Sequence, residues 1–178
     1  PGNYLNPQTI QYNFERNPFV ILSHWDWDHM ASYLRNEHIK IKDSTWIVPK
    51  QNLGISHLKV AIELYNKGNL LVWPNNITKI KTHQIKIQKL NGSDKNNSGL
   101  VLTVYIDALK SKAILLPSDA NYNLIEKNKE NYIGLVATHH GASTHNYLSK
   151  IPQAYLNSNK IAFSFGAKNT YNHPNPQS

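Results

Sequence analysis

The chain lacks cysteine altogether. Disulfides and thiolate-bound metals are therefore excluded, and imidazoles and carboxylates are the only strong ligands left for a metal ion. The sequence also lacks any apolar run near the roughly 18 to 20 residues that cross a bilayer, and no secretory leader is visible. We therefore expect a soluble protein, although the absence of cysteine identifies no compartment.

Acidic residues are scarce. Asp and Glu total 11 against 19 Lys and Arg, which gives a net charge of +8 at pH 7. Such an excess favours phosphate-rich partners through attraction and counterion release. An ordinary solubilising surface, or a composition bias of the genome, is the alternative. Much of the excess is lysine spread along the chain at Lys40, Lys42, Lys79, Lys81, Lys86, Lys89 and Lys95.

Length and composition bound the architecture. At 178 residues and 40% hydrophobic, the chain can bury one substantial core and is too short for two ordinary domains. It has no internal repeat and no low-complexity linker. We therefore expect a single domain over residues 1–178.

Hydrophobic periodicity predicts strands that alternate with helices, which is typical of the α/β class. Helices are predicted at Asp28–Asn36, at Ile55–Asn66 before the terminating Gly68, and at Tyr122–Lys129. Strands are predicted at Thr45–Val48, Leu70–Trp73, Gln84–Leu90, Leu100–Ile106, Ala113–Leu116, Ile133–Ala137 and Ile161–Phe165.

The densest chemistry lies in residues 24–29. Four of these six positions carry metal-capable side chains, directly after the apolar run Phe19–Leu22: His24, Asp26, Asp28 and His29. A strand that ends here leaves its last polar residues in a tight loop, where imidazole nitrogens and carboxylate oxygens can converge on one or two divalent ions. A solvated polar turn is the alternative, and it does not account for this density.

Residues 23–29 read SHWDWDH, which resembles the H-x-H-x-D-H motif of the metallo-β-lactamase superfamily with Asp26 in place of the second histidine. The string is more similar to the S-H-x-D-x-D-H form of the hydrolase domain in ComEC-type DNA-uptake proteins. Three later segments follow in that branch's order: Leu115–Asp119 resembles L-L-x-G-D, Thr138–Ala142 resembles H-H-G-S, and Ser164–Pro174 resembles S-x-G-x-N-x-x-Y-G-H-P. The four motifs span nearly the whole chain.

This resemblance implies a four-layer αβ/βα sandwich with metals in a cleft along the sheet edges. Relatives have strands and a D-x-G segment before the first motif, whereas this chain has 22 largely polar residues before Ser23. The difference leaves open whether the chain is a fragment that lacks those strands. The bacterial cytoplasm is the favoured compartment.

The resemblance also implies roles for the first motif. Asp28 and His29 would hold one metal ion, His24 and Asp26 the other, and Asp119 would bridge the two as an anion between cations. Two divalent ions, zinc or manganese with magnesium as a further option, would lower the pKa of a shared water towards neutrality. The carboxylate of Asp26 favours Mn²⁺ or Mg²⁺ over Zn²⁺, because it is a harder ligand than an imidazole.

The later motifs supply further ligands and substrate contacts. His139 is the preferred ligand, since only one of two consecutive side chains normally points into a site. His140 would then orient a ligand or contact the substrate. For Asp119 the alternative is the N-cap of the helix predicted from Tyr122, and both roles are compatible.

The resemblance implies two catalytic residues, Asp28 and His173. The last motif would place His173 in the cleft, either as a metal ligand or as a proton donor to the leaving group. Lys168 and Asn169 would hold phosphate oxygens. The alternative is a frayed C-terminus, because Asn172 replaces the usual glycine.

Trp25 and Trp27 flank the first ligands. One could line the cleft and stack on a base, and at least one is expected to pack beneath the site.

The function expected from these features is metal-dependent hydrolysis of phosphodiester bonds, with single-stranded DNA as a candidate substrate. The superfamily also hydrolyses lactams, lactones, thioesters and phospholipid headgroups, so the fold does not choose the substrate. A carboxyl-ester, lactone or amide hydrolase is the runner-up, and a metal-stabilised binding module without turnover is a third reading. The sequence leaves the oligomeric state open.

Overall fold

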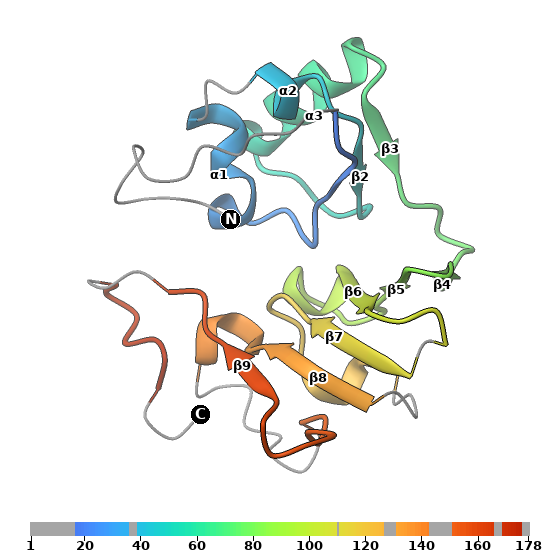
Figure 1. The fold of residues 1–178 in the computed structure, drawn as a ribbon. Coiled ribbons are helices and arrows are strands. Elements are labelled where there is room, and N and C mark those ends of the chain that lie inside the picture. Colours follow the sequence, from blue (N-terminus) through green and yellow to red (C-terminus); the bar gives the residue numbers. More distant parts are fainter. Residues whose placement is uncertain are drawn as a thin grey trace. The chain divides into compact units, whose positions relative to one another are not determined.

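A computed structural model of the chain describes residues 17–35, 39–109, 111–126, 131–142, 151–165 and 169–175. The chain divides into two compact units, Pro1–Asn76 and Ile77–Ser178, and each has its own sheet (Figure 1). Each unit also has its own hydrophobic core. The expectation of one domain over residues 1–178 stays a prediction.

The first unit contains a parallel three-stranded sheet. Its strands β1 (Val20–Ile21), β2 (Trp46–Val48) and β3 (Leu70–Val72) pair in sequence order. Parallel neighbours need crossover connections, and these contain the helices α1 (Trp27–Arg35), α2 (Ile39–Lys42) and α3 (Ile55–Asn66).

Trp46 is a central member of the first core. Its buried indole donates a hydrogen bond from Nε1 to the Ile41 carbonyl at 2.9 Å, and its ring meets Tyr33 edge-on with 5.4 Å between centroids. The buried residues of this core come from the segment that follows β1, from all three helices and from β2: Leu22, Trp25, Met30, Tyr33, Ile41, Trp46, Val48, Val60, Ala61 and Leu64.

The second unit contains a six-stranded mixed sheet whose spatial order follows the sequence: β4 (Lys79–Lys81), β5 (Ile85–Lys89), β6 (Leu100–Tyr105), β7 (Lys112–Leu116), β8 (Asn131–Val136) and β9 (Lys160–Ala162). Strands β4 to β7 are antiparallel, whereas β7, β8 and β9 are parallel. Three short 3-10 helices lie in the connections: η1 (Asn96–Ser98), η2 (Tyr122–Leu124) and η3 (Thr138–Gly141).

The middle strands of this sheet have apolar residues on both faces. One face contributes Val101, Leu115 and Leu135 to the core, where Tyr122 and Ile125 are also buried. The alternate positions on β6 and β7 are apolar as well and half-buried: Leu102, Val104, Ile114 and Leu116. A sheet of this kind needs cover on both sides.

The sequence predicts most of these elements to within a few residues. The helix Ile55–Asn66 is confirmed with its bounds, and Gly68 follows it with a positive φ of 71°. The predicted helix from Asp28 corresponds to α1, and Asn36 lies outside the described residues. The strand β4 and the short helix α2 are additions that the periodicity did not indicate.

The predicted helix Tyr122–Lys129 is wrong where it can be compared. Only Tyr122–Leu124 is helical, and Ile125 returns to extended backbone with φ −79° and ψ 129°. The side chain of Gln88 on β5 is the physical reason: its Oε1 accepts from the Glu126 N–H at 3.0 Å, and its Nε2 donates to the Leu124 carbonyl at 3.2 Å. These backbone groups are thus bonded to the sheet. Residues 127–130 lie outside the described part.

The observed elements confirm the α/β class. None of the helices in the described ranges has the length and apolar character that a membrane-crossing segment requires.

Core truncation tests this packing. Leu115→Ala removes a fully buried side chain from β7, and we expect the free energy of unfolding to fall by about 2–5 kcal/mol. The control Leu109→Ala changes a side chain that is 88% exposed and should stay within about 0.5 kcal/mol of wild type. Urea denaturation measures both, and equal losses would contradict the burial of Leu115.

Candidate functional site

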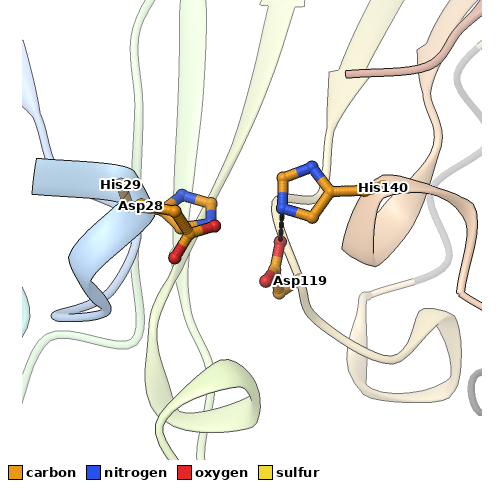
Figure 2. A group of neighbouring side chains, drawn as sticks. All are labelled: Asp28, His29, Asp119 and His140. Atoms are coloured by element: carbon orange, nitrogen blue, oxygen red, sulfur yellow. Dashed lines mark ion pairs between the residues drawn. The ribbon is translucent and has the colours of Figure 1, made fainter. Parts of the chain in front are cut away.

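The first motif lies in a loop between β1 and α1, at the carboxyl end of β1. We call residues 23–29 the motif loop. Its last part forms the first turn of α1, where the His29 N–H bonds to the Asp26 carbonyl at 3.1 Å. The carboxylate of Asp28 suits this position, because the amino end of a helix carries partial positive charge. Figure 2 shows Asp28 and His29 at this end of α1.

Trp25 fixes the motif loop to the segment that follows β2. Its backbone N–H donates to Oε1 of Gln51 at 2.9 Å, and its indole Nε1 donates to the Pro49 carbonyl at 3.0 Å. The side chain is buried in the core, so Trp25 packs beneath the ligand residues as the sequence predicts for one of the two tryptophans. Trp27 is half-buried, with its ring edge-on to His57.

The hydroxyl of Ser23 lies between the two histidines of the motif loop. Its Oγ is 3.2 Å from Nδ1 of His24 and 3.3 Å from Nδ1 of His29. The two imidazole rings are 4.1 Å apart, and His24 is buried. With the Nδ1 atoms held in this way, the Nε2 atoms are the ones directed towards carboxylates.

Each Nε2 atom faces the carboxylate of a different aspartate. His24 Nε2 is 3.4 Å from Asp26 Oδ2, and His29 Nε2 is 3.4 Å from Asp28 Oδ2. Two donors that share a tetrahedral ion at the usual metal–ligand distances lie about 3.4 Å apart. The motif loop therefore brings its metal-capable side chains together in the two pairs that the resemblance implies, at a spacing that would fit one ion for each pair.

In the second unit, three parallel strands each end next to a motif. Asp119 follows β7, the two histidines follow β8, and the segment from Phe163 follows β9. Because the carboxyl ends of parallel strands meet at one edge of a sheet, residues far apart in sequence become neighbours there.

Hydrogen bonds join the loop after β7 to the loop after β8. The His139 N–H donates to the Ser118 carbonyl at 3.0 Å, and the Thr138 N–H donates to the hydroxyl of Tyr122 at 3.2 Å. The buried hydroxyl of Thr138 donates to the Ala120 carbonyl. Burial raises the pKa of the Tyr122 hydroxyl, while its bond from Thr138 lowers it. Asp119 is thus held between two anchored neighbours.

Asn97 supports the same loop from η1. Its buried side chain accepts a hydrogen bond from the Asn121 N–H at 2.8 Å through Oδ1 and donates from Nδ2 to Asp94 at 2.9 Å. A Cβ at Gly92 would lie 2.3 Å from the Cβ of Asn97, so only glycine permits this approach. The sequence indicated no role for Asn97.

His139, His140 and Gly141 form a left-handed turn, which we call the histidine turn. Their φ angles are 46°, 56° and 83°. His139 Nε2 lies 3.9 Å from Asp119 Oδ2, and His140 Nε2 lies 3.9 Å from Asp119 Oδ1; Figure 2 marks the second ion pair. We expected only one of these two consecutive side chains to point into the site, as is normal for an extended strand, whereas in this turn both face Asp119. The preference for His139 as the metal ligand stays a prediction.

The second ring nitrogen of His140 is also engaged. Its Nδ1 donates to the backbone carbonyl of Ser164, in the segment after β9. A carbonyl only accepts, so Nδ1 carries a proton, and Nε2 is the nitrogen that faces Asp119. This is the arrangement typical of histidines that bind metals.

The C-terminal segment (residues 169–175) packs against the histidine turn, and not as a frayed end. The Asn175 N–H donates to the Gly141 carbonyl at 2.8 Å. Asn169 shapes the segment: its Nδ2 donates to the His173 carbonyl at 2.7 Å, and its Oδ1 accepts from the His173 N–H at 2.9 Å. Asn169 therefore positions His173. Its predicted contact with phosphate stays a prediction, and Lys168 lies outside the described residues.

His173 lies beside both histidines of the turn. Its ring centroid is 5.8 Å from that of His139 and 6.3 Å from that of His140. Partial burial, followed by repulsion from these two imidazoles, lowers the pKa of His173, and Asp119 acts in the opposite direction. The structure thus brings Asp119, His139, His140 and His173 together within the second unit.

Several of the lysines that could attract a phosphate-rich partner have partners within the chain. Lys79 forms an ion pair with Glu126 at 2.9 Å, and Lys81 lies over the Tyr105 ring at 5.0 Å. Lys89 donates to the Leu90 and Ser98 carbonyls, and burial lowers its pKa, while Lys86 is buried. These contacts reduce the number of lysines that a polyanion would meet on this sheet.

Three positioning residues were not found from the sequence: Asn97, Thr138 and Ser164. Thr138 was visible as the residue before the paired histidines, but its hydroxyl bond to Ala120 depends on the neighbouring strand. Ser164 contributes a backbone carbonyl, for which a sequence carries no signal.

Protein-family models, curated proteins and solved structures were compared with this chain, and none matches it.

The histidine turn gives a direct structural test. A Cβ on Gly141 would lie 2.8 Å from Pro174 Cβ and 2.9 Å from Phe163 Cδ1. We expect Gly141→Ala to cost about 1–2 kcal/mol of left-handed strain. Overpacking should cost a further amount of about 1–3 kcal/mol, and hydrogen exchange at the Asn175 amide should accelerate.

Gly68→Ala is the matched control, because Gly68 has a similar φ of 71° and no heavy atom within 4 Å of the added Cβ. It should show the strain alone in denaturant titrations. Equal losses in the two variants, with unchanged exchange at Asn175, would contradict the packing of the C-terminal segment on the turn.

Proposed function

We propose that this protein is a metal-dependent hydrolase that cleaves phosphodiester bonds, of the metallo-β-lactamase type and closest to the ComEC-type hydrolase domain. The observation that carries the proposal is the repeated pairing of a histidine Nε2 with an aspartate oxygen at the carboxyl end of a parallel strand. It occurs with 3.4 Å spacing in the motif loop and with 3.9 Å spacing at Asp119.

The donor set fits divalent cations. It consists of imidazoles and carboxylates, as Zn²⁺ and Mn²⁺ require, and two further features of metal sites support it: the helix-start position of Asp28 and the carbonyl-bound Nδ1 of His140. In the proposal, His24 and Asp26 would hold one ion and Asp28 and His29 the other, while Asp119 and the histidine turn of the second unit would contribute the remaining ligands.

His139 and His140 become equal candidates as ligands. Each faces a different oxygen of Asp119, which suits a carboxylate that bridges two cations with one histidine beside each. The proposal therefore assigns one ion to each histidine of the turn. Asp26 adds a hard oxygen donor, which favours Mn²⁺ over Zn²⁺.

When bound, the cations supply Lewis-acid stabilisation of the developing negative charge and an activated water. The residues of the chain hold this chemistry in place. Ser164 and Ser23 orient imidazoles through their hydrogen bonds, and Asn169 holds the backbone of His173 beside the ligands. His173 is proposed to donate a proton to the leaving oxygen.

The four-layer sandwich belongs to the same proposal. Its support is the sheet of the second unit, whose strands β6 and β7 have apolar side chains on both faces. In a sandwich one face packs on a second sheet and the other under helices, so both faces are covered.

A phosphodiester substrate is favoured over an ester or lactone by the net charge of +8. The contacts of Lys79, Lys81 and Lys89 within the chain reduce the number of lysines that could bind phosphates of the substrate. We therefore expect binding to depend on salt with a modest slope.

Hydrolysis assays with added Mn²⁺, Mg²⁺ or Zn²⁺ test the proposal on single-stranded DNA, bis-p-nitrophenyl phosphate, a lactone and a β-lactam. We expect phosphodiester cleavage, fastest with Mn²⁺. Asp119→Asn should lower bound metal and reduce the rate by at least about 100-fold, because it removes the bridging charge. Asp107→Asn is the control, because this carboxylate only shapes the turn before β7 by accepting from the Ser111 N–H.

Cleavage of the lactone alone would show that the protein is an ester or lactone hydrolase and not a phosphodiesterase. Absence of turnover on every substrate, with metal still bound, would leave a binding module.

His173→Ala separates its two expected roles. Loss of a proton donor should lower kcat by about 10²- to 10⁴-fold with little change in KM, and bound metal should stay at the wild-type level. Loss of one bound ion would instead show that His173 is a ligand. His83→Ala, at an exposed histidine between β4 and β5, is the control, and wild-type kinetics in both variants would remove His173 from the site.

A further inference from the structure

Three aromatic rings of the second unit form a column that ends at the surface. Tyr171 and His173 stack with 6.0 Å between centroids and 19° between planes, and His173 and His140 stack with 6.3 Å and 22°. We call Tyr171, His173 and His140 the ring column. Its inner end is the imidazole whose Nε2 lies 3.9 Å from Asp119.

The outer end of the column is open to solvent. Tyr171 is 78% exposed, although one face of its ring lies against His173. A tyrosine that served only to pack the C-terminal segment would bury more of its ring, because burial of apolar surface is what stabilises packing. Here the backbone of that segment is already held by Asn169 and by the bond from Asn175 to Gly141.

We propose that Tyr171 is a stacking platform for a nucleobase next to the phosphodiester that is cleaved. This inference rests on the proposed function and narrows its substrate to single-stranded nucleic acid. Bases in a duplex are covered by their neighbours, whereas an unpaired base offers its face to an aromatic ring. A ring roughly parallel to His173 can continue the column with an offset-stacked base at the usual centroid separations.

The neighbourhood supports a nucleic acid over a base-free phosphodiester such as a lipid headgroup. Two further exposed aromatic side chains, Phe163 and Phe165, flank the Ser164 carbonyl that bonds to His140. The positive net charge attracts the phosphate backbone without choosing a base. Stacking on Tyr171 would therefore increase the affinity for any nucleic acid with unpaired bases, whatever its base sequence.

The test compares two oligomers of equal length and charge, oligo-dT and an abasic tetrahydrofuran phosphodiester. Affinity is measured with the full chain in EDTA, so that no cleavage occurs, and KM and kcat are measured with Mn²⁺. Wild type should bind oligo-dT more tightly than the abasic oligomer. Tyr171→Ala should weaken binding of oligo-dT and raise its KM by about 5- to 150-fold, with the abasic oligomer and kcat unchanged.

Tyr171→Phe keeps the ring and should keep the affinity. Tyr65→Ala, at a tyrosine on α3 that is 73% exposed, is the matched control and should change neither oligomer. Equal losses on both oligomers, or no loss in Tyr171→Ala, would overturn the stacking role. Tighter binding of oligo-dT without any cleavage would overturn the proposed hydrolase activity but would support the stacking role of Tyr171. Cleavage of both oligomers with the same kcat and the same KM would support the hydrolase and overturn the stacking role.

Discussion

The hydrogen bonds between the loops after β7 and β8 are the constraint on which the second unit's site depends. Thr138 and His139 bond through their backbone N–H groups to Tyr122 and Ser118, and the Thr138 hydroxyl bonds to Ala120. These bonds fix the position of Asp119 relative to the histidine turn within the chain itself. Every later contact, from His140 to Ser164 and from Gly141 to Asn175, starts from this joined pair of loops.

The parallel arrangement of β7, β8 and β9 explains why residues from distant parts of the sequence are neighbours. Asp119 follows β7, His139 and His140 follow β8, and the segment with Ser164 follows β9, so the register of the sheet sets the spacing between them. Side chains that directly follow the strands of a rigid sheet are positioned more precisely than side chains on long loops. The first unit uses the same principle with β1 and β2, where Gln51 and Pro49 bind Trp25.

The sequence predicted what depends on local pattern. Strand ends and the helix Ile55–Asn66 follow from periodicity along the chain, whereas the pairing of His24 with Asp26 was implied by the resemblance to a known motif. The sequence failed where distant atoms decide the local structure: Gln88 on β5 takes the backbone groups that a helix from Tyr122 needs, and Asn97 reaches Asn121 across the fold. We preferred His139 to His140 because we assumed a strand-like alternation, whereas in this turn both side chains face Asp119.

The left-handed backbone of the histidine turn limits which amino acids can replace His139 and His140 during evolution. Among residues with a side chain, Asn, Asp and His are the ones most often found with positive φ, and β-branched residues are excluded. These three types are also oxygen and nitrogen donors. Among residues that carry a side chain, the backbone at His139 and His140 thus favours types that are nitrogen or oxygen donors. In the proposed metal site, a substitution at these two positions would therefore often exchange one donor for another while the turn keeps its shape.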